Sequence, residues 1–219
     1  MLPIVKILSI FTLIAAGMAI YFRQQNILKM YAFFKPLTTL LIIGISILIY
    51  QKQQNSYSGI LIVALLFSLI GDIFLIGENY FIYGLGSFLL AHIIYTAAFI
   101  RIGGFNNQLV IFILLLLIGG SYFLFLRKGL GNHTIPVGIY LLIILVMNWQ
   151  AIGLAITNKE TVSIMIAVAA ILFALSDATI AYSKFIKPFK IAEIIILSTY
   201  WIAIYTFTIS GLFLPKSNV

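Results

Sequence analysis

The chain has 219 residues, of which 63% are hydrophobic and only 8% are charged. Water-soluble domains carry about 25% charged residues, so this composition indicates an integral membrane protein. The lack of cysteine excludes disulfides, thiolate metal sites and cysteine nucleophiles, and two histidines are too few for a multi-histidine metal cluster. The net charge is +8, and the basic residues lie between apolar stretches without forming a Lys/Arg run. This placement favours lipid headgroups over nucleic acid as their partner.

Apolar windows long enough to cross a bilayer, about 20 residues each, recur eight times along the chain. The first window follows Lys6 and contains "AAGMA", as a signal peptide would, but it is too long for the apolar region of one. The expected transmembrane helices cover residues 3–22, 34–50, 59–76, 80–100, 108–126, 135–156, 161–182 and 190–213. The sequence therefore predicts one all-α membrane domain, residues 1–219, built as a bundle of eight transmembrane helices.

The basic residues are distributed unequally between the two ends of this bundle. Eight of the 13 Lys and Arg residues lie at the end formed by the odd-numbered loops, and five lie at the other end. Because cytoplasmic loops of membrane proteins are enriched in Lys and Arg, we expect the odd-numbered loops in the cytoplasm and both termini outside. The expected location is the cell (inner) membrane.

The two halves of the chain resemble each other. The second span begins at "KPL" with Pro36, and the sixth begins at "TIPVG" with Pro136. The third span contains "LLFSLIGD" and the seventh contains "AILFALSD". Proline is common in a first helical turn, so its recurrence alone could be a coincidence. The repeated aspartate favours a duplicated four-helix unit, with halves at residues 1–105 and 106–219.

Asp72 in "SLIGDIFLIG" and Asp177 in "FALSDATIAY" interrupt two of the apolar spans. A carboxylate within the bilayer costs about 2.5–3.5 kcal/mol on insertion scales, so it usually faces a protein interior or a water-filled cavity. The third and seventh spans run in the same direction, and each aspartate lies shortly before the end of its span. We therefore expect both carboxylates at similar depth below the odd-numbered loops, in one shared cavity.

Further polar residues are expected around this cavity. Lys35 begins the second span at the same end, and Arg127 and Lys184 lie in the loops above it. The deeper candidates are His92, Tyr95, Asn148 and Tyr200. Each also has a structural interpretation. In it, Lys35 pairs with Asp72, His92 and the two tyrosines pack between helices, and Asn148 forms an interhelical hydrogen bond. Arg127 and Lys184 then only determine the topology.

Four segments resemble the YhhN family of eight-span membrane proteins, whose characterised members include lysoplasmalogenases. They are "KPLTTLL" (35–41), "LLFSLIGDIFLI" (65–76), "GLGSFLLAHIIYTAAF" (84–99) and "LFALSDATIAYSKF" (172–185). The resemblance follows the family in order and spacing over nearly the whole chain. Where the family often has glutamine in the last span, this chain has Ile204, so one polar contact of the family's cavity is not expected.

The resemblance implies hydrolysis of the vinyl ether bond of a lysoplasmalogen, giving a fatty aldehyde and a glycerophospho-ethanolamine or -choline, without a metal or other cofactor. Asp72, on the more apolar face, is then the expected proton donor and Asp177 the ionised partner, although these two roles can be exchanged. Lys35, with Arg127 or Lys184, would hold the lipid phosphate. His92 would orient water or assist collapse of the intermediate, as would Tyr95 and Tyr200.

Two other classes of function fit the same residues. Carboxylates within the membrane and internal repeats also occur in small-molecule or proton-coupled transporters. A structural or sensory membrane protein with an incidental acidic pair is the third interpretation. The expected partners are an ether lipid or lysophospholipid substrate and the surrounding membrane lipids, with no nucleic acid.

Overall fold

The computed structural model describes residues 3–216, and within them the chain forms eight long α-helices and no strand. The helices are α1 (Pro3–Gln24), α2 (Leu28–Gln53), α3 (Ser56–Phe74), α4 (Phe81–Gly103), α5 (Leu109–Leu130), α6 (Thr134–Asn158), α7 (Thr161–Phe185) and α8 (Ala192–Ser210). Judged by length and hydropathy, the described residues contain seven candidate membrane spans, because α5 and α6 are joined by a 3-10 turn into one helical stretch, Leu109–Asn158. The prediction of an all-α, multi-pass membrane bundle is confirmed.

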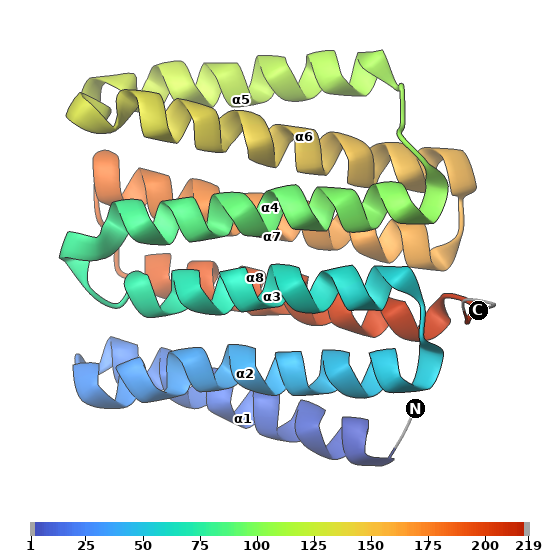
Figure 1. Cartoon of the computed structure of the whole chain (residues 1–219). Helices are drawn as coiled ribbons and strands as arrows, with labels where there is room; N and C mark the ends of the chain where they lie inside the picture. Colours follow the sequence, from blue (N-terminus) through green and yellow to red (C-terminus); the bar gives the residue numbers. More distant parts are fainter. Residues whose placement is uncertain (1–2, 217–219) are drawn as a thin grey trace.

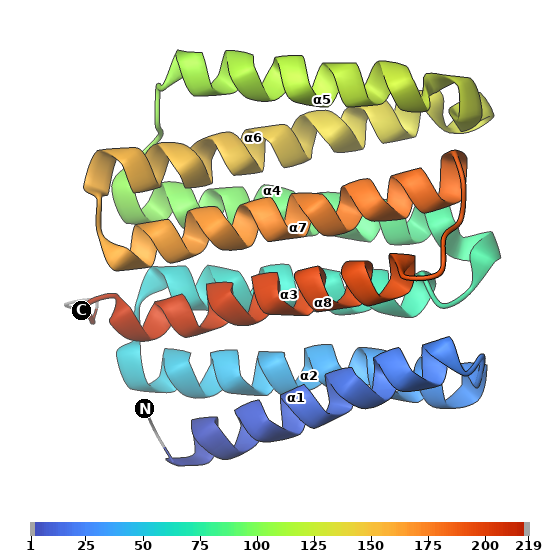
Figure 2. The same ribbon diagram turned by 180° about the vertical axis from the view of Figure 1, so that it is seen from behind.

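Consecutive helices are antiparallel (Figure 1). From one edge of the bundle, α1, α2, α3 and α4 follow in chain order to α5 at the other edge, and α6, α7 and α8 return, with α7 beside α4 and α8 beside α3 (Figures 1 and 2). The α1–α2 pair and the α5–α6 pair lie at opposite edges, with α3, α4, α7 and α8 between them (Figures 1 and 2). The odd-numbered loops gather at one end of the bundle, and the even-numbered loops and both termini gather at the other (Figure 1). We call these the odd-loop end and the even-loop end.

The second helix begins earlier than the sequence predicts. We expected it to start at residue 34 with Pro36 in its first turn, but α2 begins at Leu28 and Pro36 lies in its interior. The charge of Lys29 lowers the local hydropathy without disfavouring a helix, which is why the apolar window starts too late. Pro136, by contrast, lies in the first turn of α6 as predicted.

The buried core lies mainly between α2, α3, α4, α6, α7 and α8. Its largest fully buried side chains include Tyr95, Phe99, Phe173 and Phe207, which contact one another across α4, α7 and α8. Large hydrophobic side chains of α1 and α5 point outward instead. An outward apolar surface suits a bundle surrounded by lipid, because lipid tails solvate such side chains as well as a protein core does.

The end of α5 approaches the end of α7 very closely. A Cβ atom at Gly129 would overlap the backbone carbonyl oxygen of Phe185. Backbone atoms cannot rotate out of the way as a flexible side chain can, so this approach depends on the missing side chain. Small residues commonly permit such close approaches between membrane helices.

We predict that Gly129→Ala destabilises the bundle by about 1–3 kcal/mol, the usual cost of overpacking. The measurement is the thermal unfolding midpoint of the purified protein in detergent. Gly120→Ala on the same helix is the matched control, because a Cβ atom there meets no other atom within 4 Å. Equal midpoints for the two variants would contradict the predicted overlap.

Candidate active site

Asp72 lies near the end of α3 and is held by side chains of α2 and α8. Its Oδ2 atom accepts hydrogen bonds from Thr39 Oγ1 at 2.6 Å and from Tyr200 OH at 2.8 Å. The Nζ atom of Lys35 lies 3.8 Å from Asp72 Oδ1. The Asp72 side chain is only 1% exposed and that of Lys35 only 6%. Two helices, α2 and α8, thus supply one cation and two hydroxyl donors to a fully buried carboxylate on α3.

The local sequence explains how these groups meet. Lys35 and Thr39 are four residues apart on α2, so they lie on the same helix face one turn apart. Trp201, next to Tyr200 on α8, donates from Nε1 to Thr39 Oγ1 at 3.3 Å. Gly71 precedes Asp72, and a Cβ atom there would lie 2.6 Å from ring atoms of Phe88. The absence of that Cβ lets the Phe88 ring of α4 pack directly against the backbone of α3 at the residue before Asp72.

Asp177 lies on α7 with different partners. Its Oδ2 atom accepts a hydrogen bond from Tyr140 OH at 2.7 Å and lies 3.4 Å from His92 Nε2. His92 is fully buried, and neither of its ring nitrogens makes a well-formed hydrogen bond within residues 3–216. Its ring packs against Phe173 with centroids 4.6 Å apart. Asp177 is therefore paired with one hydroxyl donor and one imidazole.

A small cavity of about 40 Å³ opens beside Asp177 toward the odd-loop end. Apolar side chains of α4, α6 and α7, with Leu75 directly after α3, form most of its wall, and Asp177 and Tyr140 are its polar members. The Asp177 side chain is 12% exposed, compared with 1% for Asp72. Of the two carboxylates, Asp177 alone lines this cavity.

Aromatic rings connect the two carboxylate clusters. The Tyr200 ring, bonded to Asp72, lies 5.3 Å from the Phe173 ring and 5.6 Å from the Phe88 ring. Phe173 in turn contacts His92, and Phe88 lines the cavity of Asp177. The two carboxylates share no hydrogen-bond or ion-pair partner within residues 3–216. Neighbouring clusters joined by rings thus replace the single shared cavity expected from the sequence.

Charged groups continue from Lys35 toward the surface of the odd-loop end. Lys35 Nζ lies 5.8 Å from the centre of the Tyr31 ring, and the Arg23 guanidinium lies 5.2 Å from the same ring. Arg23 also forms an ion pair with Glu193 at 2.8 Å, and both side chains are about one-third exposed. The resulting order, from the surface inward, is the Arg23–Glu193 pair, Tyr31, Lys35 and Asp72.

The other predicted site residues lie farther from the carboxylates. Tyr95 OH is 3.2 Å from Ser68 Oγ, one helical turn before Asp72. Asn148 is buried but donates to the Ile144 carbonyl of its own helix, and Arg127 is exposed on α5. Lys184 Nζ lies 4.4 Å from the Phe81 ring, which lines the cavity of Asp177. Within residues 3–216, no hydrogen bond or ion pair joins Asn148 or Arg127 to either carboxylate cluster.

Sequence reasoning missed three polar partners, namely Thr39, Tyr140 and Trp201. Thr39 could have been found from its position one turn after Lys35 in "KPLTTLL". Tyr140 likewise follows Pro136 by one turn on α6. Within the described residues, no three His, Asp or Glu side chains converge as metal ligands would.

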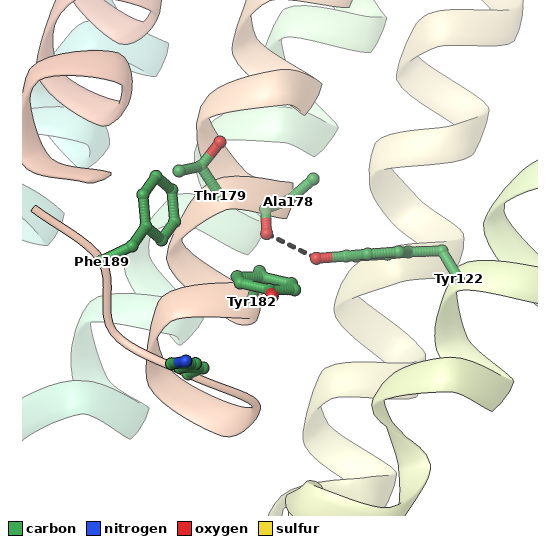
Figure 3. Close-up of a pocket in the computed structure, with 6 residues that line it drawn as sticks. Tyr122, Ala178, Thr179, Tyr182 and Phe189 are labelled. Carbon is green, nitrogen blue, oxygen red and sulfur yellow. Dashed lines mark hydrogen bonds between the residues drawn. The ribbon is translucent and has the colours of Figure 1, made fainter. Parts of the chain in front are cut away.

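A wider groove of about 530 Å³ lies on another side of α7, bordered by α5 and by the α7–α8 connection (Figure 3). The rings of Tyr122, Tyr182 and Phe189 line it. Tyr122 OH donates to the Ala178 carbonyl at 2.6 Å, as the dashed line in Figure 3 shows. Although Ala178 directly follows Asp177, the Asp177 carboxylate is not part of this groove.

Comparison with known proteins gives a consistent result. The model of the YhhN family matches residues 30–211. Lysoplasmalogenase TMEM86A of Bos taurus is 36% identical over 148 residues, which cover 64% of this chain and 60% of that protein. Lysoplasmalogenase TMEM86B of Homo sapiens is 32% identical over 167 residues, covering 75% of this chain and 69% of that protein. No solved structure matches the chain.

The family match starts within α2 and ends just after α8, so it leaves out α1 alone among the eight helices. It contains both aspartates and every side chain that hydrogen-bonds to them. On a match that covers well over half of its length, the chain belongs to the YhhN family.

Proposed function

We propose that the chain hydrolyses the vinyl ether bond of lysoplasmalogens, releasing a fatty aldehyde and a glycerophospho-ethanolamine or -choline. Relatives that are 32–36% identical are named lysoplasmalogenases, which suggests the substrate class. The observation that carries the proposal is the carboxyl group of Asp177, which lines an apolar cavity beside Tyr140. An acid in such a place can meet a lipid group with little competition from bulk water.

The chemistry requires an acid, an anion and a positioned water. Protonation of the vinyl carbon farther from the ether oxygen forms a C–H bond and leaves an oxocarbenium ion. Water then adds to the cationic carbon, loses a proton and gives a hemiacetal. Collapse of the hemiacetal breaks the carbon–oxygen bond to glycerol, which yields the aldehyde and the alcohol. Glycosidases stabilise a related oxocarbenium-like transition state with two carboxyl groups in different environments.

The surroundings of the two aspartates favour different roles. Asp72 receives two hydroxyl hydrogen bonds and lies near the Lys35 ammonium, and these contacts favour its ionised form. Asp177 has one hydroxyl donor and no lysine or arginine partner within the described residues. We therefore assign proton donation to Asp177 and stabilisation of the cation to Asp72, which reverses the roles expected from the sequence.

The rings between the clusters suggest where the substrate lies. A vinyl ether placed against Phe88 and Tyr200 would have Asp72 on one side and the Asp177 cavity on the other. Rotation of the Phe88 side chain would extend the cavity toward Asp72. His92 would then accept the proton that the attacking water releases, since it lies 3.4 Å from Asp177 and can pass the proton on to it.

We predict that Asp177→Asn and Asp72→Asn each lower aldehyde release by about 10²–10⁴-fold, the usual contribution of acid–base catalysis. The measurement is aldehyde produced from lysoplasmalogen by the purified protein in detergent. Glu160→Gln is the control, because it removes the same charge from an exposed position at the even-loop end. Full turnover in either aspartate variant would remove that aspartate from the mechanism.

We predict that Tyr200→Phe and Thr39→Val each lower kcat by about ten- to a hundredfold, because each removes a hydrogen bond to a charged group worth about 1.5–3 kcal/mol. The matched control is Tyr57→Phe, which loses a buried hydrogen bond to the Phe207 carbonyl at the even-loop end. Tyr57→Phe should lower the unfolding midpoint and leave kcat unchanged. If all three variants lose activity only in proportion to stability, Tyr200 and Thr39 have structural roles.

We also propose that the protein lies in the cell (inner) membrane with its odd-numbered loops in the cytoplasm. The larger share of Lys and Arg at the odd-loop end supports this orientation. The absence of cysteine from the chain permits a direct test with two single-cysteine variants, Asn132→Cys and Asn107→Cys, at exposed positions of opposite loops. An impermeant maleimide should label Cys at 107 in intact cells and Cys at 132 only after permeabilisation. The reverse pattern would invert the orientation.

A further inference from the structure

A groove of about 510 Å³ runs along the outside of the bundle between residues 9–20 of α1 and residues 198–205 of α8. We call it the α1–α8 groove. Its volume lies within the range of about 300–1,000 Å³ that is usual for small-ligand pockets. Most of its lining is apolar, and the hydroxyl groups of Ser9, Thr12 and Tyr205 are already hydrogen-bonded within the protein. Such a lining suits a hydrocarbon chain.

We propose that the α1–α8 groove binds the chain of a single-chain, zwitterionic lysophospholipid and guides this lipid from the bilayer to Asp72. The proposal rests on the proposed function, because it identifies how the substrate of that reaction reaches the site. The contacts at the end and along the floor of the groove support it independently.

The first contact is the Arg23–Glu193 ion pair, which joins the same two helices beyond the odd-loop end of the groove. Ile20 and Ser198 line the groove, and Arg23 and Glu193 lie about one turn farther along α1 and α8. Both charged side chains are about one-third exposed. A zwitterionic headgroup carries a phosphate that matches the arginine and an ammonium that matches the glutamate. Charge and shape are thus ordered as in a lysophospholipid, with the headgroup at the end and the chain in the groove.

The second contact is Trp201, which links the groove to the candidate active site. Its side chain lines the groove, and its Nε1 donates to Thr39 Oγ1 at 3.3 Å. Thr39 in turn donates to Asp72 at 2.6 Å. The ether bond of a lysoplasmalogen lies between the glycerol and the chain, so a lipid in this position has its reactive bond at the depth of Trp201 and Asp72.

The outer wall of the groove is α1, which lies outside the residues matched by the family model. Gly17 makes part of this wall, and a Cβ atom there would meet no other atom within 4 Å. A large side chain at this position would therefore fill the groove without displacing the protein. A substitution of Gly17 can therefore test whether the groove binds the lipid chain.

The experiment uses fluorescence of Trp201 in a Trp149→Phe background, where it is the sole tryptophan of the chain. The probe is an ester-linked lysophosphatidylcholine with a brominated chain, which lacks the vinyl ether and is not consumed by the proposed reaction. We expect saturable quenching that unlabelled lysophosphatidylcholine reverses. Gly17→Phe should raise the lipid concentration at half-maximal quenching by about tenfold or more. Gly120→Phe on α5, where a Cβ atom also meets open space, should leave this concentration unchanged.

Three outcomes would overturn the proposal. They are quenching that does not saturate, equal quenching in the Gly17→Phe variant, and equal quenching by a two-chain brominated phosphatidylcholine, which would indicate ordinary bilayer lipid. Failure of the proposed function gives a different result, since saturable quenching without aldehyde release keeps the groove and removes the reaction. Aldehyde release without saturable quenching keeps the reaction and removes the groove.

The headgroup end has its own readout. Lysophosphatidic acid has the phosphate but lacks the ammonium, so the wild-type protein should bind it more weakly than lysophosphatidylcholine in competition with the brominated probe. Glu193→Gln should reduce this preference, because it removes the partner of the ammonium. An unchanged preference in Glu193→Gln would remove Glu193 from headgroup recognition and would overturn the orientation proposed for the lipid.

Discussion

The buried carboxylate of Asp72 imposes the strongest constraint on this bundle. A carboxylate away from water needs both a counter-charge and hydrogen-bond donors, and here α2 supplies Lys35 and Thr39 while α8 supplies Tyr200. Removing one member of a buried ion pair typically costs about 3–5 kcal/mol, because the other charge remains unpaired. The position of α3 against α2 and α8 is therefore fixed by the same contacts that prepare the candidate site. The contacts that stabilise the bundle at Asp72 are thus also the ones on which the proposed function depends.

The sequence predicts the fold well because hydropathy and length control it directly. Eight apolar stretches of membrane-spanning length leave few alternatives to an eight-helix bundle. The errors occur at helix ends, as at Leu28, where the single charge of Lys29 shifts an apolar window without ending the helix. Helix limits depend on backbone geometry and local contacts, which a hydropathy window does not measure.

The candidate site is predicted only in part. The rarity of acids in lipid identifies Asp72 and Asp177 from composition alone, and their shared depth follows from helix direction. Their partners do not follow, because a serine, threonine or tyrosine in a membrane helix is common and its neighbours depend on helix rotation. Thr39 lies one turn after Lys35 and Tyr140 one turn after Pro136, but only the packed helices show which carboxylate each of them bonds. For the same reason, the sequence does not show that the Asn148 amide donates to a carbonyl of its own helix and not to the site.

The gathering of charged side chains at the odd-loop end has a further consequence. Arg23, Glu193, Lys35 and Asp72 form one series from the surface inward at that end, and Asp177 lines a cavity that opens toward the same end. A lipid whose headgroup lies in the opposite leaflet would have to cross the bilayer before reaching either carboxylate. For the proposed reaction, this arrangement predicts access from a single leaflet, so the rate at which lipids flip between leaflets would limit how much of the membrane's ether lipid is hydrolysed.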